Sequence, residues 1–148
     1  MRGFFEIGIY RGKTPNNVGT LWRSASQMGA AGIFTVGKRY PRQASDTVKA
    51  CRHVPMREFT DIDDLLSGLP YGAPIVAVEM GGKSLPSFNH PQQAVYLLGA
   101  EDHGIPASVL AKCHHVISLP SIRTNSYNVA VAGSLVMWDR LVKSGDFK

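Results

Sequence analysis

Apolar, β-branched segments alternate with helical segments along most of this chain, and that alternation constrains the fold more than any other feature. A break at residues 15–17 precedes the first predicted helix, and residues 38–42 form a basic loop. Strands joined by helical crossovers run parallel, so we predict an α/β fold with a mostly parallel, Rossmann-like sheet flanked by helices. The predicted strands are residues 4–10, 33–36, 54–59, 74–79, 94–98 and 116–119, and the predicted helices are 18–28, 45–51, 61–67, 106–112 and 128–143.

Length and composition are those of one globular domain covering residues 1–148. Cys51 and Cys113 are the only cysteines, so a disulfide framework is excluded and a cytoplasmic protein is expected. Glu6 interrupts the first apolar run, which therefore differs from a signal peptide, and no apolar run approaches the roughly 20 residues that span a bilayer. The net charge of +5 is compatible with a polyanionic partner and equally with an ordinary basic protein.

Several familiar sites are excluded by spacing. Residues 77–84 resemble a phosphate-binding P-loop, but the pattern requires glycine at Ala77 and a helix where Leu85 and Pro86 stand. We therefore interpret Gly82-Lys83 as an ordinary turn. No dinucleotide-binding glycine pattern and no nucleophile elbow is present. No metal is expected, because metal-ligand spacing is lacking among Cys51, His53, Cys113, His114 and His115.

Ligands of open parallel sheets bind beyond the carboxyl ends of the strands, which directs attention to the loops after Glu79, Leu98 and Leu119. Residues 97–106 follow a buried strand with Gly99, where a ligand can approach the backbone, and with Glu101, which is either functional or a solvent-facing acid. Ser126 and Asn128 precede the last helix, where capping and binding are compatible.

Residues 17–25 form a third candidate segment. Asn17 and Gly19 lie at a predicted helix start, where free N–H groups favour anions. Arg23 lies one to two turns further on, and alone it reads as a solvated helix arginine.

Together and in this order, the three segments resemble the three motifs of the SpoU (TrmH-like) family of RNA ribose 2'-O-methyltransferases, in the SPOUT superfamily. Asn17, Gly19, Arg23 and Ala25 match N-x-G-x-x-x-R-x-A. Gly99, Glu101, Gly104, Ile105 and Pro106 match G-x-E-x-x-G-[IL]-P. Ile117, Leu119, Pro120, Ser126, Asn128, Val129 and Ala130 match I-x-[IL]-P followed by S-[LM]-N-[VL]-[SA], with Tyr127 departing from leucine or methionine.

The resemblance implies a C-terminal trefoil knot that binds S-adenosylmethionine, a homodimer with the site near its interface, and methylation of RNA. It also implies an RNA ribose 2'-O-methyltransferase with a catalytic set of Arg23, Asn17, Glu101, Ser126 and Asn128, in which Asn17 and Glu101 fix Arg23. The implied cofactor contacts lie at Val78, Leu98, Gly99, Leu119 and Ser126. Leu21, Trp22, Leu135 and Trp138 are expected either at the dimer interface or in the core.

The expected substrate is tRNA, including its wobble nucleotide, because the chain begins at the first strand without a separate RNA-binding domain, as minimal family members do. Three alternatives stay open: a ribosomal RNA methyltransferase of the same fold, a non-catalytic RNA-binding module, and an unrelated nucleotide-binding protein. Asp102 and His103 depart from the residues that relatives carry. Side chains that could contact phosphates are Lys38, Arg39, Arg42, Lys49, Arg52 and Arg123.

Overall fold

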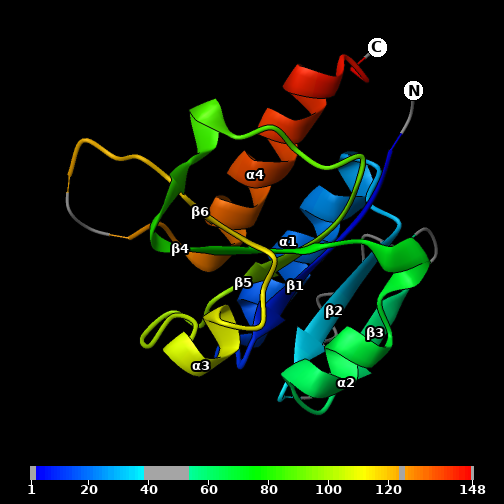
Figure 1. The fold of residues 1–148 in the computed structure, drawn as a ribbon, viewed down its shortest axis with the longest axis vertical. Coiled ribbons are helices and arrows are strands. Elements are labelled where there is room, and N and C mark those ends of the chain that lie inside the picture. Colours follow the sequence, from blue (N-terminus) through cyan, green and yellow to red (C-terminus); the bar gives the residue numbers. More distant parts are fainter. Residues whose placement is uncertain (1–2, 39–53, 124–125, 148) are drawn as a thin grey trace.

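The computed structural model describes residues 3–38, 54–123 and 126–147, which form one six-stranded sheet (Figure 1). The strand order is β3-β2-β1-β5-β4-β6, and every neighbouring pair is parallel, which confirms the predicted sheet. The strands are β1 (Phe4–Tyr10), β2 (Gly32–Val36), β3 (Met56–Phe59), β4 (Ile75–Ser84), β5 (Gln93–Leu98) and β6 (His115–Ser118).

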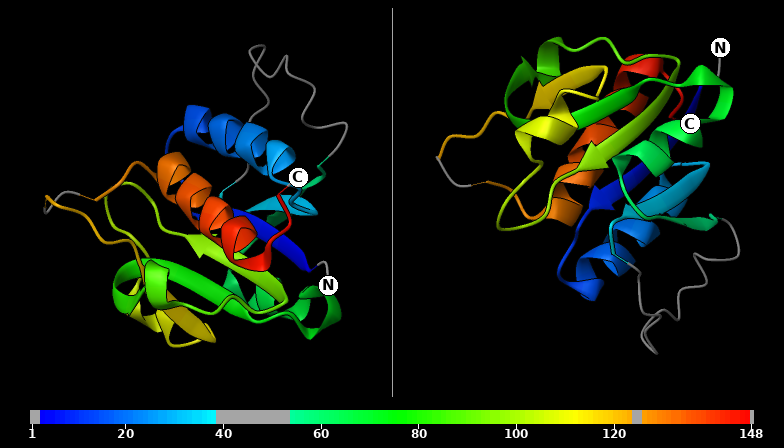
Figure 2. Two further views of the ribbon diagram at one scale, coloured as in Figure 1. Left: turned by 90° about the horizontal axis from the view of Figure 1, so that it is seen from above. Right: turned by 60° about the horizontal axis from the view of Figure 1, so that its bottom comes forward.

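Helices cover both faces of the sheet. They are α1 (Pro15–Gln27), α2 (Ile62–Ser67), α3 (Ala107–Leu110) and α4 (Val129–Ser144). Figure 2 shows α1 and α4 side by side on one face, with α2 and α3 on the other, as the burial of a parallel sheet requires. Among the described helices, none has the length and apolar character needed to cross a membrane. The predicted helix at 45–51 lies outside the described residues, and the knot stays a prediction.

Helix α1 begins three residues earlier than predicted. The segment 15–17 is the first turn of this helix, so its interpretation as a break in the chain was wrong. Thr14 is the N-cap, and Pro15 stands in the first turn, where its fixed φ suits a helix and its missing N–H has no intrahelical partner to lose. This start places Asn17 inside the first turn, at the carboxyl end of β1.

The two faces of the sheet bury separate apolar clusters. Ile7 and Leu98 pack with residues of α1 and α4, whereas Phe34 and Leu97 pack with residues of α2 and α3. Leu21 and Trp22 of α1 are buried in the first cluster, so within this chain they are core residues. Leu135 and Trp138 of α4 are exposed, by 38% and 56%.

Strand β4 continues beyond Glu79, where a turn was predicted at Gly82-Lys83. Its pairing with β6 shifts register between Val78 and Lys83, and the strand then runs on to Ser84. A Cβ atom at Gly82 would lie 2.6 Å from the backbone of Val116. The glycine therefore allows a close approach of two strands, so the interpretation of this segment as an ordinary turn was wrong.

Candidate functional site

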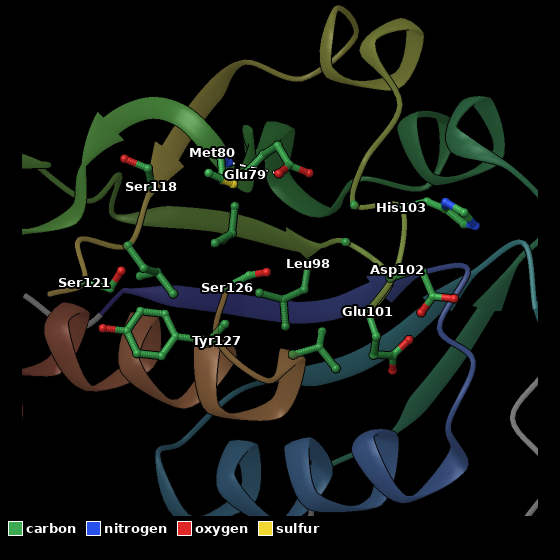
Figure 3. A pocket seen from close by; sticks show the side chains of 17 residues that line it. Glu79, Met80, Leu98, Glu101, Asp102, His103, Ser118, Ser121, Ser126 and Tyr127 are labelled. Carbon is green, nitrogen blue, oxygen red and sulfur yellow. Dashed lines mark hydrogen bonds between the residues drawn. The ribbon is translucent and has the colours of Figure 1, made fainter. Parts of the chain in front are cut away.

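A cavity of about 330 Å³ opens at the carboxyl edge of the sheet (Figure 3). It is lined by the part of β4 around Val78, by the turn after β5 and by the segment between β6 and α4. The cavity adjoins the end of β5, which pairs with β4 on one side and with β1 on the other, although no residue of β1 lines the cavity. The strand order reverses between β1 and β5. Such a reversal of strand order is where open α/β sheets bind ligands.

All five residues expected to contact a cofactor line this cavity. They come from three strands or the segments that follow them, and their role as cofactor contacts stays a prediction. Position 99 requires glycine, because a Cβ atom there would lie 2.7 Å from the Cα atom of Gly104. The five residues are Val78, Leu98, Gly99, Leu119 and Ser126.

Asn17 joins the three motif segments through hydrogen bonds. Its Nδ2 donates to Oε1 of Glu101 over 2.7 Å, and its Oδ1 accepts from Nδ2 of Asn128 over 3.1 Å. Asn128 in turn caps α4, since its Oδ1 accepts from the N–H groups of Ala130 and Val131. The structure thus brings together Asn17, Glu101 and Asn128, one residue from each motif segment.

The carboxylate of Glu101 lies at the N-terminus of α1, where the helix has no acidic residue of its own. Its Oε2 accepts from the backbone N–H of Lys13 over 3.2 Å. Burial acts to raise the pKa of Glu101, but hydrogen bonds from the Asn17 side chain and from backbone N–H groups together hold it below its ordinary value. The anion at this helix start is therefore the protein's own carboxylate.

A second link joins the same two loops. The ammonium of Lys13 forms an ion pair with Asp102 on the exposed side of the turn. The hydrogen bond from Lys13 within this ion pair is the main reason that the pKa of Asp102 lies below its ordinary value. Asp102, a departure from the family pattern, thus attaches the turn after β5 to the loop after β1.

Arg23 lies apart from this network. It is exposed on α1, does not line the cavity, and makes no hydrogen bond or ion pair with any described residue. Asn17 and Glu101 bond to other described residues and not to Arg23, so the expectation that they fix Arg23 stays a prediction. On the same helix, Ser24 accepts a hydrogen bond of 3.0 Å from Ser134 of α4.

Ser126 and Tyr127 contribute the remaining side of the cavity. The hydroxyl of Tyr127 donates to the carbonyl oxygen of Pro120 over 2.8 Å, a bond that leucine or methionine could not make. Ser126 lines the cavity, and Asn128, the other candidate for the N-cap, is the residue that caps α4.

Glu79 was not predicted as a site residue, although the loop after it was. Its Oε2 accepts from the backbone N–H of Ile105 over 2.7 Å, and its Oε1 accepts from its own neighbour Met80 over 2.9 Å. The first bond joins β4 to the turn after β5, from an acid outside the three motifs to Ile105 of the second motif. An acid directly after a buried apolar run, at the ligand-binding edge, was the signal available in the sequence.

Comparison with known proteins agrees with the motifs. The model of the SpoU rRNA Methylase family matches residues 5–138. An uncharacterized tRNA/rRNA methyltransferase of Archaeoglobus fulgidus is 26% identical over 128 residues, which cover 82% of this chain and 57% of that protein. The mouse tRNA (guanosine(18)-2'-O)-methyltransferase TARBP1 is 30% identical over 137 residues, 84% of this chain and 8% of that one. The chain thus spans little more than half the length of curated relatives such as the first.

Solved structures show the same fold. One, from work on the 2-OH methylation of C/U34 on tRNA, superposes with a TM-score of 0.86 at 22% identity and covers 98% of this chain and 99% of its own. AviRb of Streptomyces viridochromogenes, in complex with AdoMet, gives a TM-score of 0.86 at 20% identity, covering 100% of this chain and 60% of its own. With the family model matched over residues 5–138, this chain belongs to the SpoU rRNA methylase family.

Proposed function

We propose that this protein transfers the methyl group of S-adenosylmethionine to a ribose 2'-hydroxyl in RNA, with tRNA as the substrate. The observation that carries the proposal is the hydrogen-bonded set of Asn17, Glu101 and Asn128, of which Glu101 lines the cavity, in a chain of the SpoU family. The match to the structure from work on C/U34 of tRNA supports the wobble nucleotide as the target. A cytoplasmic location belongs to the same proposal.

The cavity has the features that a bound S-adenosylmethionine requires. Its volume falls at the lower end of the range for small-molecule sites, roughly 300–1,000 Å³. Gly99 lines the cavity with its backbone, and Leu98 and Leu119 supply apolar walls. When bound, the cofactor supplies the methyl group together with its sulfur leaving group. Val78, Leu98, Gly99, Leu119 and Ser126 would hold it.

Arg23 is the side chain to which we assign the RNA-facing role. An arginine that makes no bond within the described residues keeps its donors available for a phosphate or a developing alkoxide. A guanidinium group offers hydrogen-bond donors and no acceptor, which disfavours a role as a general base. Asn17, Glu101 and Asn128 would hold the start of α1, the turn after β5 and the start of α4 in place around the ribose.

The homodimer is part of this proposal. The exposed apolar side chains of α4 recur at helical spacing and form one stripe beside α1, the helix that carries Arg23. A second copy that covers the stripe would lie next to Arg23. Light scattering should give twice the chain mass for the wild type and a monomer for Trp138→Glu; a monomeric wild type would contradict the dimer. The stripe consists of Val131, Leu135, Trp138 and Val142.

The decisive experiment supplies labelled S-adenosylmethionine with total tRNA and ribosomal RNA as separate substrates, followed by nucleoside analysis. Label in a 2'-O-methylated nucleoside of tRNA supports the proposal, and label only in ribosomal RNA supports the alternative substrate. Arg23→Ala should abolish transfer while calorimetry shows unchanged cofactor affinity. Gln27→Ala, exposed one turn further along α1, is the matched control and should keep full activity. RNA binding without any transfer would instead indicate a non-catalytic module.

A further inference from the structure

Glu79 places a carboxylate in the cavity from a strand that none of the three motifs includes. The preceding residue, Val78, still pairs with Leu98 of β5, and the register of β4 with β6 shifts directly after it. The side chain is partly buried and lines the cavity beside Leu98. In Figure 3 it lies on the other side of Leu98 from Glu101, whose carboxylate points toward α1.

The position of this carboxylate is fixed by the turn after β5. Both of its oxygens accept hydrogen bonds from backbone N–H groups, those of Ile105 and Met80. Gly104 has a φ of +62°, and a Cβ atom there would lie 2.2 Å from Oε2 of Glu79. Glycine at position 104 therefore adopts the left-handed conformation and leaves room for the carboxylate. The two hydrogen bonds hold that carboxylate in place.

The charge of Glu79 is not balanced by a cation. Three acids line the cavity, Glu79, Glu101 and Asp102, together with His103, whereas no lysine or arginine of the described residues does so. Asp102 is paired with Lys13, and Glu101 sits at the positive end of α1. Glu79 makes no ion pair with any described residue and has only the two peptide N–H groups as partners. The cavity thus favours a cationic ligand.

We propose that Glu79 is a cofactor-binding residue that selects the positively charged S-adenosylmethionine over its neutral product. This inference rests on the cofactor assigned to the cavity under the proposed function. S-adenosylmethionine carries a sulfonium and an ammonium against one carboxylate, and S-adenosylhomocysteine lacks the sulfonium charge. A fixed, unpaired carboxylate in a partly water-excluded cavity attracts the first more strongly than the second. The same difference favours release of the product after methyl transfer.

Calorimetric titration with S-adenosylmethionine and with S-adenosylhomocysteine tests this selection. Glu79→Gln removes the charge and keeps an oxygen that can accept from Ile105. The wild type should prefer S-adenosylmethionine, and the substitution should reduce that preference about five- to tenfold, mainly by weakening S-adenosylmethionine. Because the preference is a ratio within one protein, a loss of folded molecules affects both affinities alike and leaves the ratio unchanged.

A remote substitution of equal charge is the control. Asp63→Asn on α2 also removes one negative charge, from a side chain that does not line the cavity. It should leave the preference unchanged, and a shift as large as that of Glu79→Gln would overturn the proposal. Equal weakening of both ligands by Glu79→Gln, or no change in either, would overturn it as well. A wild type that binds neither ligand would overturn the cofactor assignment itself, an outcome distinguishable from a failure of Glu79 alone.

Discussion

The side-chain amide of Asn17 donates a hydrogen bond of 2.7 Å to Glu101 and accepts one of 3.1 Å from Asn128. These partners lie 84 and 111 positions away in the chain. An amide is suited to this place because it offers a donor to a carboxylate and an acceptor to a second amide at once. One side chain of α1 therefore fixes the loop after β5 and the start of α4 relative to each other.

Asn17→Asp should weaken this arrangement more than its small change in size suggests. The substitution replaces the donor that faces Glu101 with a second carboxylate, and two carboxylates at hydrogen-bond distance repel each other. We expect a loss of about 1–3 kcal/mol in the free energy of unfolding at pH 7, measured in urea. Asn16→Asp is the control, because it adds the same charge in the same helical turn. Asn16 is exposed and is not the hydrogen-bond partner of Glu101. Equal effects of the two substitutions would contradict the role of the amide.

The two functions of Asn128 can be separated by two substitutions. Asn128→Asp keeps the oxygen that caps α4 and loses the donor to Asn17, whereas Asn128→Ala loses both. Loss of an N-cap costs about 1 kcal/mol, so the alanine variant should be less stable than the aspartate variant by roughly that amount. Thermal unfolding of both proteins measures the difference. Were the two equally stable, the cap would contribute nothing to α4.

Much of the fold was predictable because its signals are local. The apolar runs predicted β1 and β5 to within a residue. Asn17, Glu101 and Asn128 were singled out by the resemblance to the family motifs, and the structure joins them by hydrogen bonds. The start of α1 was missed because proline reads as a breaker unless the helix is known to begin there. The end of β4 was missed because its register shift depends on contact with β6.

The site was predictable only as far as its motifs extend. Leu98, Gly99 and Ser126 line the cavity as expected, but Glu79 contacts Ile105 across 26 positions, and no local pattern encodes that pairing. Arg23 was assigned correctly to α1, yet its lack of contact with Asn17 is a property of packing. Side-chain direction depends on neighbours from distant segments, which periodicity does not report.

Two glycines with nearly equal φ values allow the contact at Glu79 to be measured. Gly104 and Gly72 have φ values of +62° and +64°, so alanine at either position is strained by about 1–2 kcal/mol. A Cβ atom at Gly72 would have no atom within 4 Å, whereas one at Gly104 would collide with Glu79. Gly104→Ala should therefore lower the free energy of unfolding by clearly more than Gly72→Ala. Equal losses would show that the carboxylate moves aside freely.

A partly buried network of polar side chains between β5 and α4 should make the free energy of unfolding depend on pH. His90 Nε2 lies 2.7 Å from Asp139, and His90 Nδ1 lies 2.7 Å from the hydroxyl of Tyr96, which also accepts from Arg140. Nε2 therefore carries the proton donated to the carboxylate, and Nδ1 accepts from the tyrosine. Lys143 pairs with the same carboxylate over 2.8 Å. This network suits neutral His90, because its unprotonated Nδ1 then accepts the tyrosine proton.

Acidification should thus destabilise the protein through His90. Burial lowers the pKa of His90 below 6.5, against the opposing effect of Asp139, so the unfolded chain binds this proton more readily than the folded one. The stabilisation is complete above pH 6.5 and is lost as the pH falls through the lowered pKa, with a slope of at most about 1.4 kcal/mol per pH unit. The free energy of unfolding in urea, measured at several values between about pH 4.5 and 8, gives this slope. His90→Gln should remove it, whereas His103→Gln, at an exposed position on the turn after β5, should keep it. A slope that survives His90→Gln would assign the effect to other groups.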